Sequence, residues 1–192
     1  MADATRRAAL LLATAAALPA AMTAPAAAAP EAAPESVFAF RLESLEGGPL
    51  DLGRFRGRPM LVANTASFCG YTPQYAGLEA LHRRYGPRGL VVLGVPSNDF
   101  NQESGDPAAI RQFCEANYDV TFPMAMPAHV RGPEAHPLFA FLAARGGGAP
   151  RWNFHKYLIG RNGKVVGSFG STVDPQSPKV VELIEQQLAA RP

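Results

Sequence analysis

Cysteine is the strongest nucleophile among the side chains of this sequence, and the chain has two, Cys69 and Cys114. Cys69 closely follows a continuous apolar run, residues 59–66, that is typical of a buried strand. The next segment, residues 72–85, repeats apolar residues at helical spacing, and Pro73 is acceptable in a first helical turn. We therefore expect Cys69 at the junction between a strand and the start of a helix.

A junction of this kind favours a reactive thiolate at Cys69. Free backbone N–H groups and the positive end of a helix dipole lower the pKa of a thiol, and the thiolate is the reactive form. The alternative is that Cys69 is a small buried apolar residue without chemistry. Gly70, Tyr71 and Thr72 follow it, so a dithiol exchange motif, which needs a second cysteine at the fourth position, is absent.

The other hydrophobic patterns predict a single α/β domain. A chain of 192 residues, 47% of them hydrophobic, can bury one sizeable core but not two ordinary ones. A second apolar run and a helical pattern follow the first pair, and this order implies a βαβ crossover with two parallel strands. The expected segments are a hairpin at 37–42 and 49–52, strands at 59–66, 89–96 and 122–124, helices at 72–85, 108–118, 134–144 and 177–190, and a hairpin at 157–169 that turns at 162–163. They are compatible with a thioredoxin-like fold: a central mixed β-sheet flanked by helices, with an N-terminal β-hairpin.

Residues 1–28 have the pattern of a signal peptide. Arg6 and Arg7 precede an Ala/Leu-rich run and then small residues, with cleavage expected near Ala28. The run contains Pro19 and is too short for a comfortable membrane span of about 20 residues. We expect export to the periplasm or the medium, by the general secretory route in preference to the twin-arginine route. A disordered Ala/Pro tail and an uncleaved membrane anchor are the alternatives.

The predicted boundaries leave a Pro/Ala linker at 29–36 and the catalytic domain at 37–192. The formal net charge is +2, and the Lys and Arg residues are scattered along the chain with no dense run. This distribution argues against nucleic acid as a partner.

Three sequence blocks resemble the glutathione peroxidase family. Residues 64–75 (NTASFCGYTPQY) are similar to the active-site block of that family, residues 94–103 (GVPSNDFNQE) to its second block, and residues 152–159 (WNFHKYLI) to its third. The blocks occur in the family's order, and the resemblance extends over residues 37–190. It implies a thiol peroxidase that reduces hydrogen peroxide and organic hydroperoxides, with an antioxidant role.

By position, the resemblance implies a catalytic tetrad of Cys69, Gln102, Trp152 and Asn153. Amide and indole N–H groups can donate hydrogen bonds to a sulfur anion and to peroxide oxygens, and none of them is a competing base. Taken alone, Gln102 is equally typical of a polar loop, Trp152 of a core or rim, and Asn153 of a turn.

The sequence departs from the family pattern at two places in the second block. The spacing from Phe100 to Gln102 is one residue shorter than expected, which affects the backbone path to Gln102. Asp99 stands where many relatives have glutamine. The nucleophile is cysteine in place of the selenocysteine of some relatives, so a slower intrinsic reaction is expected.

Cys114 lies in a segment, residues 111–115, that resembles the resolving-cysteine segment of relatives recycled by thioredoxin. The implied cycle oxidises Cys69 to a sulfenic acid, joins it to Cys114 as a disulfide, and reduces that disulfide with an external dithiol. Because Cys114 is expected within a helix, that helix must partly unwind. If Cys114 is instead inert, glutathione or another thiol would react with the sulfenic acid directly.

We expect no metal and no bound cofactor, because the spacing of the histidines suggests no metal site. His136 is expected to cap or pack a helix, and His155 flanks the third block. The short connection from His136 to Trp152 is typical of monomeric relatives. A peroxiredoxin is disfavoured because Ala66 stands where that class has threonine. A thioredoxin-like thiol-disulfide oxidoreductase and a non-enzymatic redox sensor are the remaining alternatives.

Overall fold

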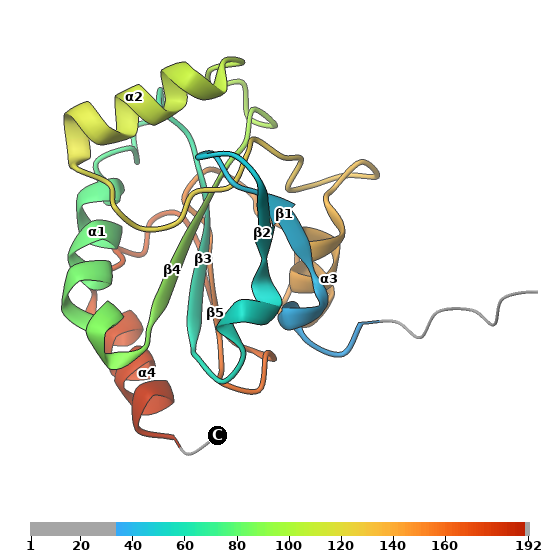
Figure 1. Ribbon diagram of the computed structural model, residues 1–192, viewed down its shortest axis with the longest axis vertical. Helices are drawn as coiled ribbons and strands as arrows, with labels where there is room; N and C mark the ends of the chain where they lie inside the picture. The colour runs from blue at the N-terminus through green and yellow to red at the C-terminus, as the bar shows by residue number, and fades with distance from the viewer. Residues whose placement is uncertain (1–33, 191–192) are drawn as a thin grey trace, which may run out of the picture. The chain divides into compact units, whose positions relative to one another are not determined.

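The computed structural model describes residues 34–190, so the predicted signal peptide lies outside the described residues and the predicted linker lies partly outside them. A four-stranded mixed sheet forms its centre (Figure 1), with strand order β4-β3-β5-β6. The strands are β3 (Met60–Thr65), β4 (Val91–Pro96), β5 (Lys156–Ile159) and β6 (Val165–Phe169). β3 and β4 are parallel, while β5 pairs antiparallel with both β3 and β6. The predicted crossover and the C-terminal hairpin are confirmed.

Four α-helices surround the sheet: α1 (Gln74–Tyr85), α2 (Pro107–Tyr118), α3 (Pro137–Arg145) and α4 (Pro178–Ala189). In Figure 1, α1 and α4 lie along one face, α3 and the N-terminal hairpin lie on the other, and α2 crosses above the end where β3 and β4 finish. The hairpin consists of β1 (Arg41–Glu43) and β2 (Pro49–Asp51). The thioredoxin-like fold with an added hairpin is confirmed. Among the described residues, no helix is long and apolar enough to cross a bilayer.

The two faces of the sheet bury separate cores because successive strand residues point to opposite sides. Met60, Val62 and Leu93 face α3 and the hairpin, whereas Leu61 and Val92 face the helices on the opposite side. Cys69 and Cys114 both belong to this second core, with residues of α1, α2 and α4. All six residues of β3, and all six of β4, are buried, which explains why their sequences are mostly apolar.

The first half of the strand predicted at 37–42 and the strand predicted at 122–124 are wrong, whereas residues 41–42 pair in β1 as expected. Residues 37–39 form a 3-10 turn, η1 (Val37–Ala39), because Val37 and Phe38 are both buried and the turn closes through the Phe40 N–H to the Val37 carbonyl at 3.2 Å. Residues 122–124 do not form a strand, since Pro123 has no N–H to donate and only single bridges connect this segment to β4 and to Ser44. Two further 3-10 turns are η2 (Leu52–Phe55) and η3 (Gly86–Arg88).

The helix predicted at 134–144 begins later, at Pro137. His136 is its N-cap, and its ring nitrogen accepts a hydrogen bond from the Leu138 N–H at 3.2 Å, as the capping interpretation predicted.

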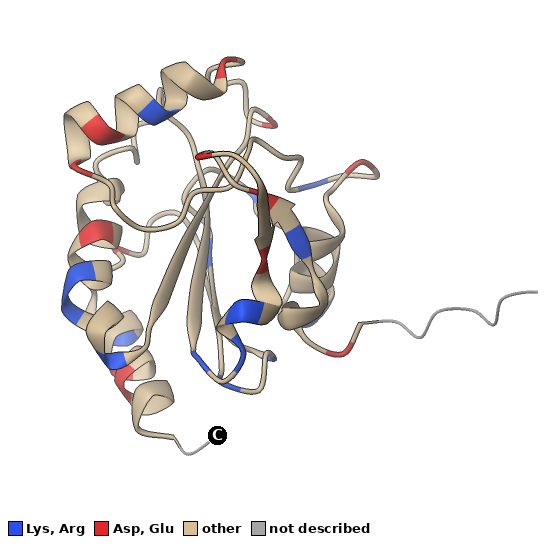
Figure 2. Ribbon diagram, viewed as in Figure 1, with Lys and Arg blue, Asp and Glu red and all other residues tan. Residues whose placement is uncertain are grey.

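Charges of both signs are interspersed over the described residues (Figure 2), in line with the scattered Lys and Arg of the sequence.

Candidate active site

Cys69 lies in the turn between β3 and α1, beside the end of the sheet that α2 covers. The expected strand-to-helix junction is confirmed, and residues 70–73 separate Cys69 from the first residue of α1. The sulfur accepts a local hydrogen bond from the Tyr71 N–H at 3.4 Å, and the residue is 7% exposed. The sulfur is therefore largely enclosed and has a backbone N–H as its hydrogen-bond donor.

Thr72 fixes the backbone of this turn. Its hydroxyl accepts a hydrogen bond from the Cys69 N–H at 3.0 Å and donates one to the Ala66 carbonyl at 2.9 Å. Both bonds are buried, so the single hydroxyl satisfies two backbone groups that have no water nearby. Sequence reasoning missed this role, although a threonine three residues after the cysteine at a predicted helix start was a usable signal.

Gln102 and Asn153 come together although 51 residues separate them: the Asn153 amide donates to Gln102 Oε1 at 3.0 Å. Gln102 is also fixed to the cysteine turn, because its carbonyl accepts the Phe68 N–H at 2.9 Å. The shortened spacing before Gln102 is absorbed at Asn101, which has a φ of +56° and bonds through its N–H to the Asn98 carbonyl at 2.9 Å. Asparagine tolerates this left-handed conformation well.

Trp152 is held at its backbone by Asn64, the one amide side chain of β3. Asn64 Nδ2 donates to the Trp152 carbonyl at 3.2 Å, and Asn64 Oδ1 accepts the His155 N–H at 3.1 Å. The indole ring lies 5.2 Å from the ring of Phe100 and is 41% exposed. A polar residue inside the apolar run at 59–66 was the sequence signal for Asn64, and sequence reasoning did not use it.

The predicted tetrad is thus assembled only in part. Asn153 contacts Gln102, and Gln102 contacts the cysteine turn, but no hydrogen bond joins the Cys69 sulfur to the side chain of Gln102, Trp152 or Asn153 within residues 34–190. Asn153 Oδ1 is buried without a partner. The Gln102–Asn153 amide pair is therefore attached to the cysteine turn through the Gln102 backbone, and its side chains make no hydrogen bond to the sulfur.

Glu103 is a buried carboxylate next to Gln102 that sequence reasoning did not assign. Its Oε1 accepts the N–H groups of Ser67 and Ser104 at 3.2 and 2.8 Å, while Oε2 is buried without a partner. Burial raises the pKa of Glu103, and the hydrogen bonds from both serines oppose that rise. Because Ser67 lies two residues before Cys69, Glu103 links the second sequence block to the cysteine turn.

Lys156 connects the start of α1 to the loop that contains Val173. Its ammonium group, fully buried, donates to Gln74 Oε1 at 2.8 Å and to the Val173 carbonyl at 2.5 Å. Burial lowers the pKa of Lys156 to about 8. His155 lies beside it, bonded to the Ser168 hydroxyl at 2.9 Å, and burial lowers its pKa to about 4.

Cys114 is on α2, 2% exposed, and is not paired with Cys69. Burial, the largest cause, raises the pKa of Cys114 to about 11, and the carboxylates of Glu103 and Glu115 add to it, while the Tyr75 hydroxyl opposes it. The group is therefore a protonated thiol at neutral pH.

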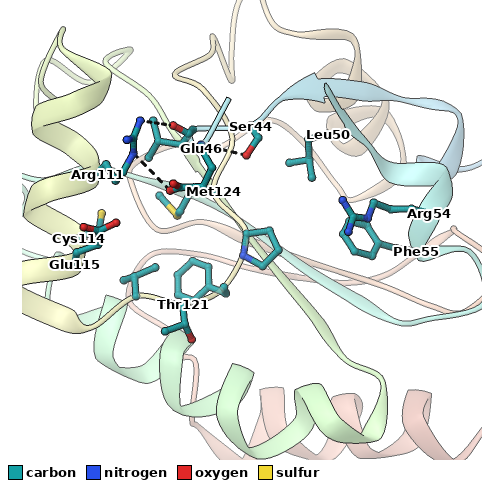
Figure 3. Close-up of a pocket in the computed structure, with 14 residues that line it drawn as sticks. Ser44, Glu46, Leu50, Arg54, Phe55, Arg111, Cys114, Glu115, Thr121 and Met124 are labelled. Atoms are coloured by element: carbon teal, nitrogen blue, oxygen red, sulfur yellow. Dashed lines mark hydrogen bonds and ion pairs between the residues drawn. The ribbon is translucent and has the colours of Figure 1, made fainter. Parts of the chain in front are cut away.

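The side of α2 that carries Cys114 borders a cavity of about 430 Å³ (Figure 3) between α2 and the N-terminal hairpin. Arg111 lies at the α2 end of this cavity, where its guanidinium donates to the Leu45 carbonyl at 2.7 Å and pairs with Glu46 at 3.5 Å. Arg111 thus ties α2 to the hairpin turn. Among the described residues, no group of three or more His, Cys, Asp or Glu could hold a metal ion.

The family model for glutathione peroxidase matches residues 37–143, more than half of the chain, and this range includes Cys69, Gln102 and Cys114. The chain belongs to the glutathione peroxidase family. It is a peroxidase of the glutathione peroxidase type, an oxidoreductase that reduces hydroperoxides with thiol chemistry on a thioredoxin-like fold. Trp152 and Asn153 lie beyond the matched range.

Named relatives and a solved structure agree with this assignment. The chain is 47% identical over 154 residues to the hydroperoxy fatty acid reductase gpx1 of Synechocystis sp., covering 74% of this chain and 91% of the relative. It is 43% identical over 136 residues to the glutathione peroxidase-like peroxiredoxin gpx1 of Schizosaccharomyces pombe, covering 68% and 86%. The crystal structure of Trgpx in its apo form matches with a TM-score of 0.67 at 33% identity, covering 82% of this chain and 99% of that one.

Proposed function

We propose that Cys69 is the residue attacked by hydroperoxide. Its thiolate attacks one peroxide oxygen, the O–O bond breaks, and the sulfur becomes a sulfenic acid while the second oxygen leaves with a proton as water or alcohol. The geometry at Cys69 carries this proposal: a buried sulfur facing the Tyr71 N–H, in a turn bonded to Gln102.

Gln102, Trp152 and Asn153 would stabilise the charge that develops as the O–O bond breaks. Asn153 orients the Gln102 amide through its own N–H, leaving the Gln102 amide protons free to face the substrate. The ring of Phe68, directly before Cys69 in the chain, is 66% exposed, and the ring of Trp152 is 41% exposed. They favour organic hydroperoxides, including those of fatty acids, as substrates besides hydrogen peroxide, in agreement with the name of the Synechocystis relative.

Cys114 would resolve the sulfenic acid. Its thiol attacks the Cys69 sulfur, the S–O bond breaks, and water leaves as the disulfide forms. The buried, protonated thiol cannot do this while α2 is intact, so α2 must open at Cys114 first. Contact between the rings of Phe68 and Phe113, 6.3 Å apart, joins the cysteine turn to the same helix and must change at this step.

A thioredoxin-like dithiol would then reduce the disulfide, and glutathione is the alternative reductant if Cys114 does not resolve. The peroxiredoxin name of the Schizosaccharomyces relative supports the first choice. The test is steady-state hydroperoxide reduction with thioredoxin and its reductase against glutathione and its reductase, for the native protein, Cys69→Ser and Cys114→Ser. Turnover retained by Cys69→Ser would contradict the central assignment. Thioredoxin-dependent turnover retained by Cys114→Ser would contradict the resolving role alone.

A thiol-disulfide oxidoreductase remains the second candidate, because the fold is shared with that class. The second cysteine of a dithiol motif would stand three residues after Cys69, where this chain has Thr72, and the Thr72 hydroxyl is bonded to the Cys69 N–H and the Ala66 carbonyl. An insulin-reduction assay separates the two: we expect no activity above that of Cys69→Ser. A redox sensor would be oxidised once by peroxide but would show no multiple turnover.

We also propose that residues 1–28 direct export to the periplasm or the medium. The basic pair Arg6–Arg7 before an Ala/Leu-rich run supports this. Cell fractionation and N-terminal sequencing of the mature protein test it, with cleavage expected near Ala28. Loss of export in a double Arg6→Lys, Arg7→Lys variant would indicate the twin-arginine route, whereas unchanged export would indicate the general one.

A further inference from the structure

Asp99, the residue that departs from the family's usual glutamine, accepts three hydrogen bonds from one short loop, residues 129–131. The donors are His129 Nδ1 at 2.6 Å, the Val130 N–H at 2.7 Å and the Arg131 N–H at 3.2 Å. The Asp99 side chain is 10% exposed. Burial by itself would raise the pKa of Asp99, but these hydrogen bonds outweigh it and lower the pKa, so the carboxylate is charged at neutral pH.

The loop that Asp99 binds also places a cation on an aromatic residue of the active site. The Arg131 guanidinium lies 5.1 Å from the centroid of the Phe100 ring, and the same Phe100 ring lies 5.2 Å from the ring of Trp152. Phe100 is directly bonded in the chain to Asp99. Asp99 is therefore connected to both partners of this cation–ring contact: Phe100 follows it in the chain, and its carboxylate holds the backbone of Arg131.

Trp152 needs such support because its ring is only partly enclosed. Asn64 fixes the Trp152 carbonyl, but that bond leaves the side-chain torsions free. The contact with Phe100 is the one aromatic contact recorded for the indole among residues 34–190. A hydrogen-bond donor aimed at a developing charge loses much of its effect when it is misplaced by about 1 Å.

We propose that Asp99 is a positioning residue for the Trp152 indole, acting through Arg131 and Phe100. The carboxylate fixes the 129–131 loop, Arg131 holds the Phe100 ring from one side, and the ring in turn orients the indole N–H toward the peroxide site. The catalytic consequence of this inference rests on the proposed function, in which Trp152 takes part in peroxide reduction. The positioning of the Trp152 ring by Asp99 does not depend on that function.

Trp152 is the single tryptophan of the chain, so its fluorescence reports its own environment. In Asp99→Asn and Arg131→Gln we expect a shifted emission maximum and stronger quenching by acrylamide, because the indole becomes freer. Matched controls are Asp51→Asn, a carboxylate that also bonds a backbone N–H and an arginine, and Arg54→Gln, an arginine over another phenylalanine. Both controls should leave the emission unchanged. Circular dichroism and thermal unfolding show whether each variant is folded.

A double-mutant cycle with Trp152→Phe connects the positioning to catalysis. We expect Asp99→Asn to lower kcat/KM for hydroperoxide about tenfold in the native background and to have no further effect in Trp152→Phe. Native emission in folded Asp99→Asn, or additive losses in the cycle, would overturn the inference. An unchanged kcat/KM in Trp152→Phe would instead overturn the proposed role of Trp152, while the fluorescence arm would still decide whether Asp99 positions the ring.

Discussion

The Asn153 amide donates a 3.0 Å hydrogen bond to Gln102 Oε1, joining the chain after α3 to the loop before α2. The direction of this bond matters, because Gln102 uses its oxygen on Asn153 and keeps its N–H groups for a ligand. The pair thereby turns a residue that could either donate or accept into a donor, which is what a developing oxyanion requires.

Replacing Asn153 by alanine should weaken both stability and catalysis. The Gln102 oxygen loses its donor and its amide can rotate, so we expect a loss of about 1–3 kcal/mol in the free energy of unfolding and a lower kcat/KM for hydroperoxide. Urea unfolding and steady-state kinetics measure the two effects. Asn117→Ala, which removes an exposed amide bonded to the Phe113 carbonyl, is the control and should change neither. Native kinetics in Asn153→Ala would contradict the assigned role.

Thr72→Val should damage the cysteine turn without changing the size of the side chain. The Cys69 N–H and the Ala66 carbonyl both lose their partner, at an expected cost of about 1–3 kcal/mol in the free energy of unfolding, with a slower reaction of Cys69 with peroxide. Thr72→Ser keeps the hydroxyl and should retain most of both properties. If valine and serine behave alike in denaturant titration and stopped-flow oxidation, the hydroxyl is not what fixes the turn.

Removal of the Arg111 bonds should make Cys114 easier to reach. In a Cys69→Ser background, where no disulfide can form, we expect Arg111→Met to increase the rate of Cys114 alkylation by iodoacetamide, because α2 is no longer tied to the Leu45 carbonyl and Glu46. In the native background the same variant should form the Cys69–Cys114 disulfide faster after peroxide treatment. Arg41→Met removes an exposed pair within the hairpin and serves as the control. Equal alkylation rates in the two variants would show that opening of α2 does not depend on Arg111.

Glu103 should make stability fall as the pH rises. Its pKa in the folded protein is raised above the ordinary value of 4.5, so the folded state binds its proton more tightly than the unfolded state. The contribution of this group is fully present below that ordinary pKa and is lost as the pH rises through the raised value. Glu103→Gln retains an oxygen for the Ser67 and Ser104 N–H groups but carries no charge, so this pH dependence should disappear. The free energy of unfolding measured from pH 4 to pH 8 tests it, and an unchanged profile in Glu103→Gln would assign the dependence to another group.

Much of the fold was predictable because the two parallel strands are buried on both faces and their sequences are mostly apolar. Hydrophobic periodicity predicted the wrong secondary structure where contacts with distant segments decide the local conformation. Val37 bonds to the Gly163 carbonyl, which no local pattern indicates, and the apolar alternation at 37–40 became a 3-10 turn. The strand predicted at 122–124 does not form, and here the sequence did hold the signal, because Pro123 has no N–H for strand pairing.

The sequence by itself determined the family and the identities of Cys69, Gln102, Trp152, Asn153 and Cys114 as the residues to examine, because chemistry depends on residue type and order. Only the tertiary structure decided how far α1 begins after Cys69, which atom of Gln102 faces Asn153, and that Cys114 is a buried thiol on the inner side of α2. These properties arise from hydrogen bonds and burial between segments far apart in the chain, for which no local pattern exists. The spacing predicted the strand-to-helix junction at Cys69, and the tertiary structure added the Tyr71 N–H and the Thr72 hydroxyl as its hydrogen-bond partners.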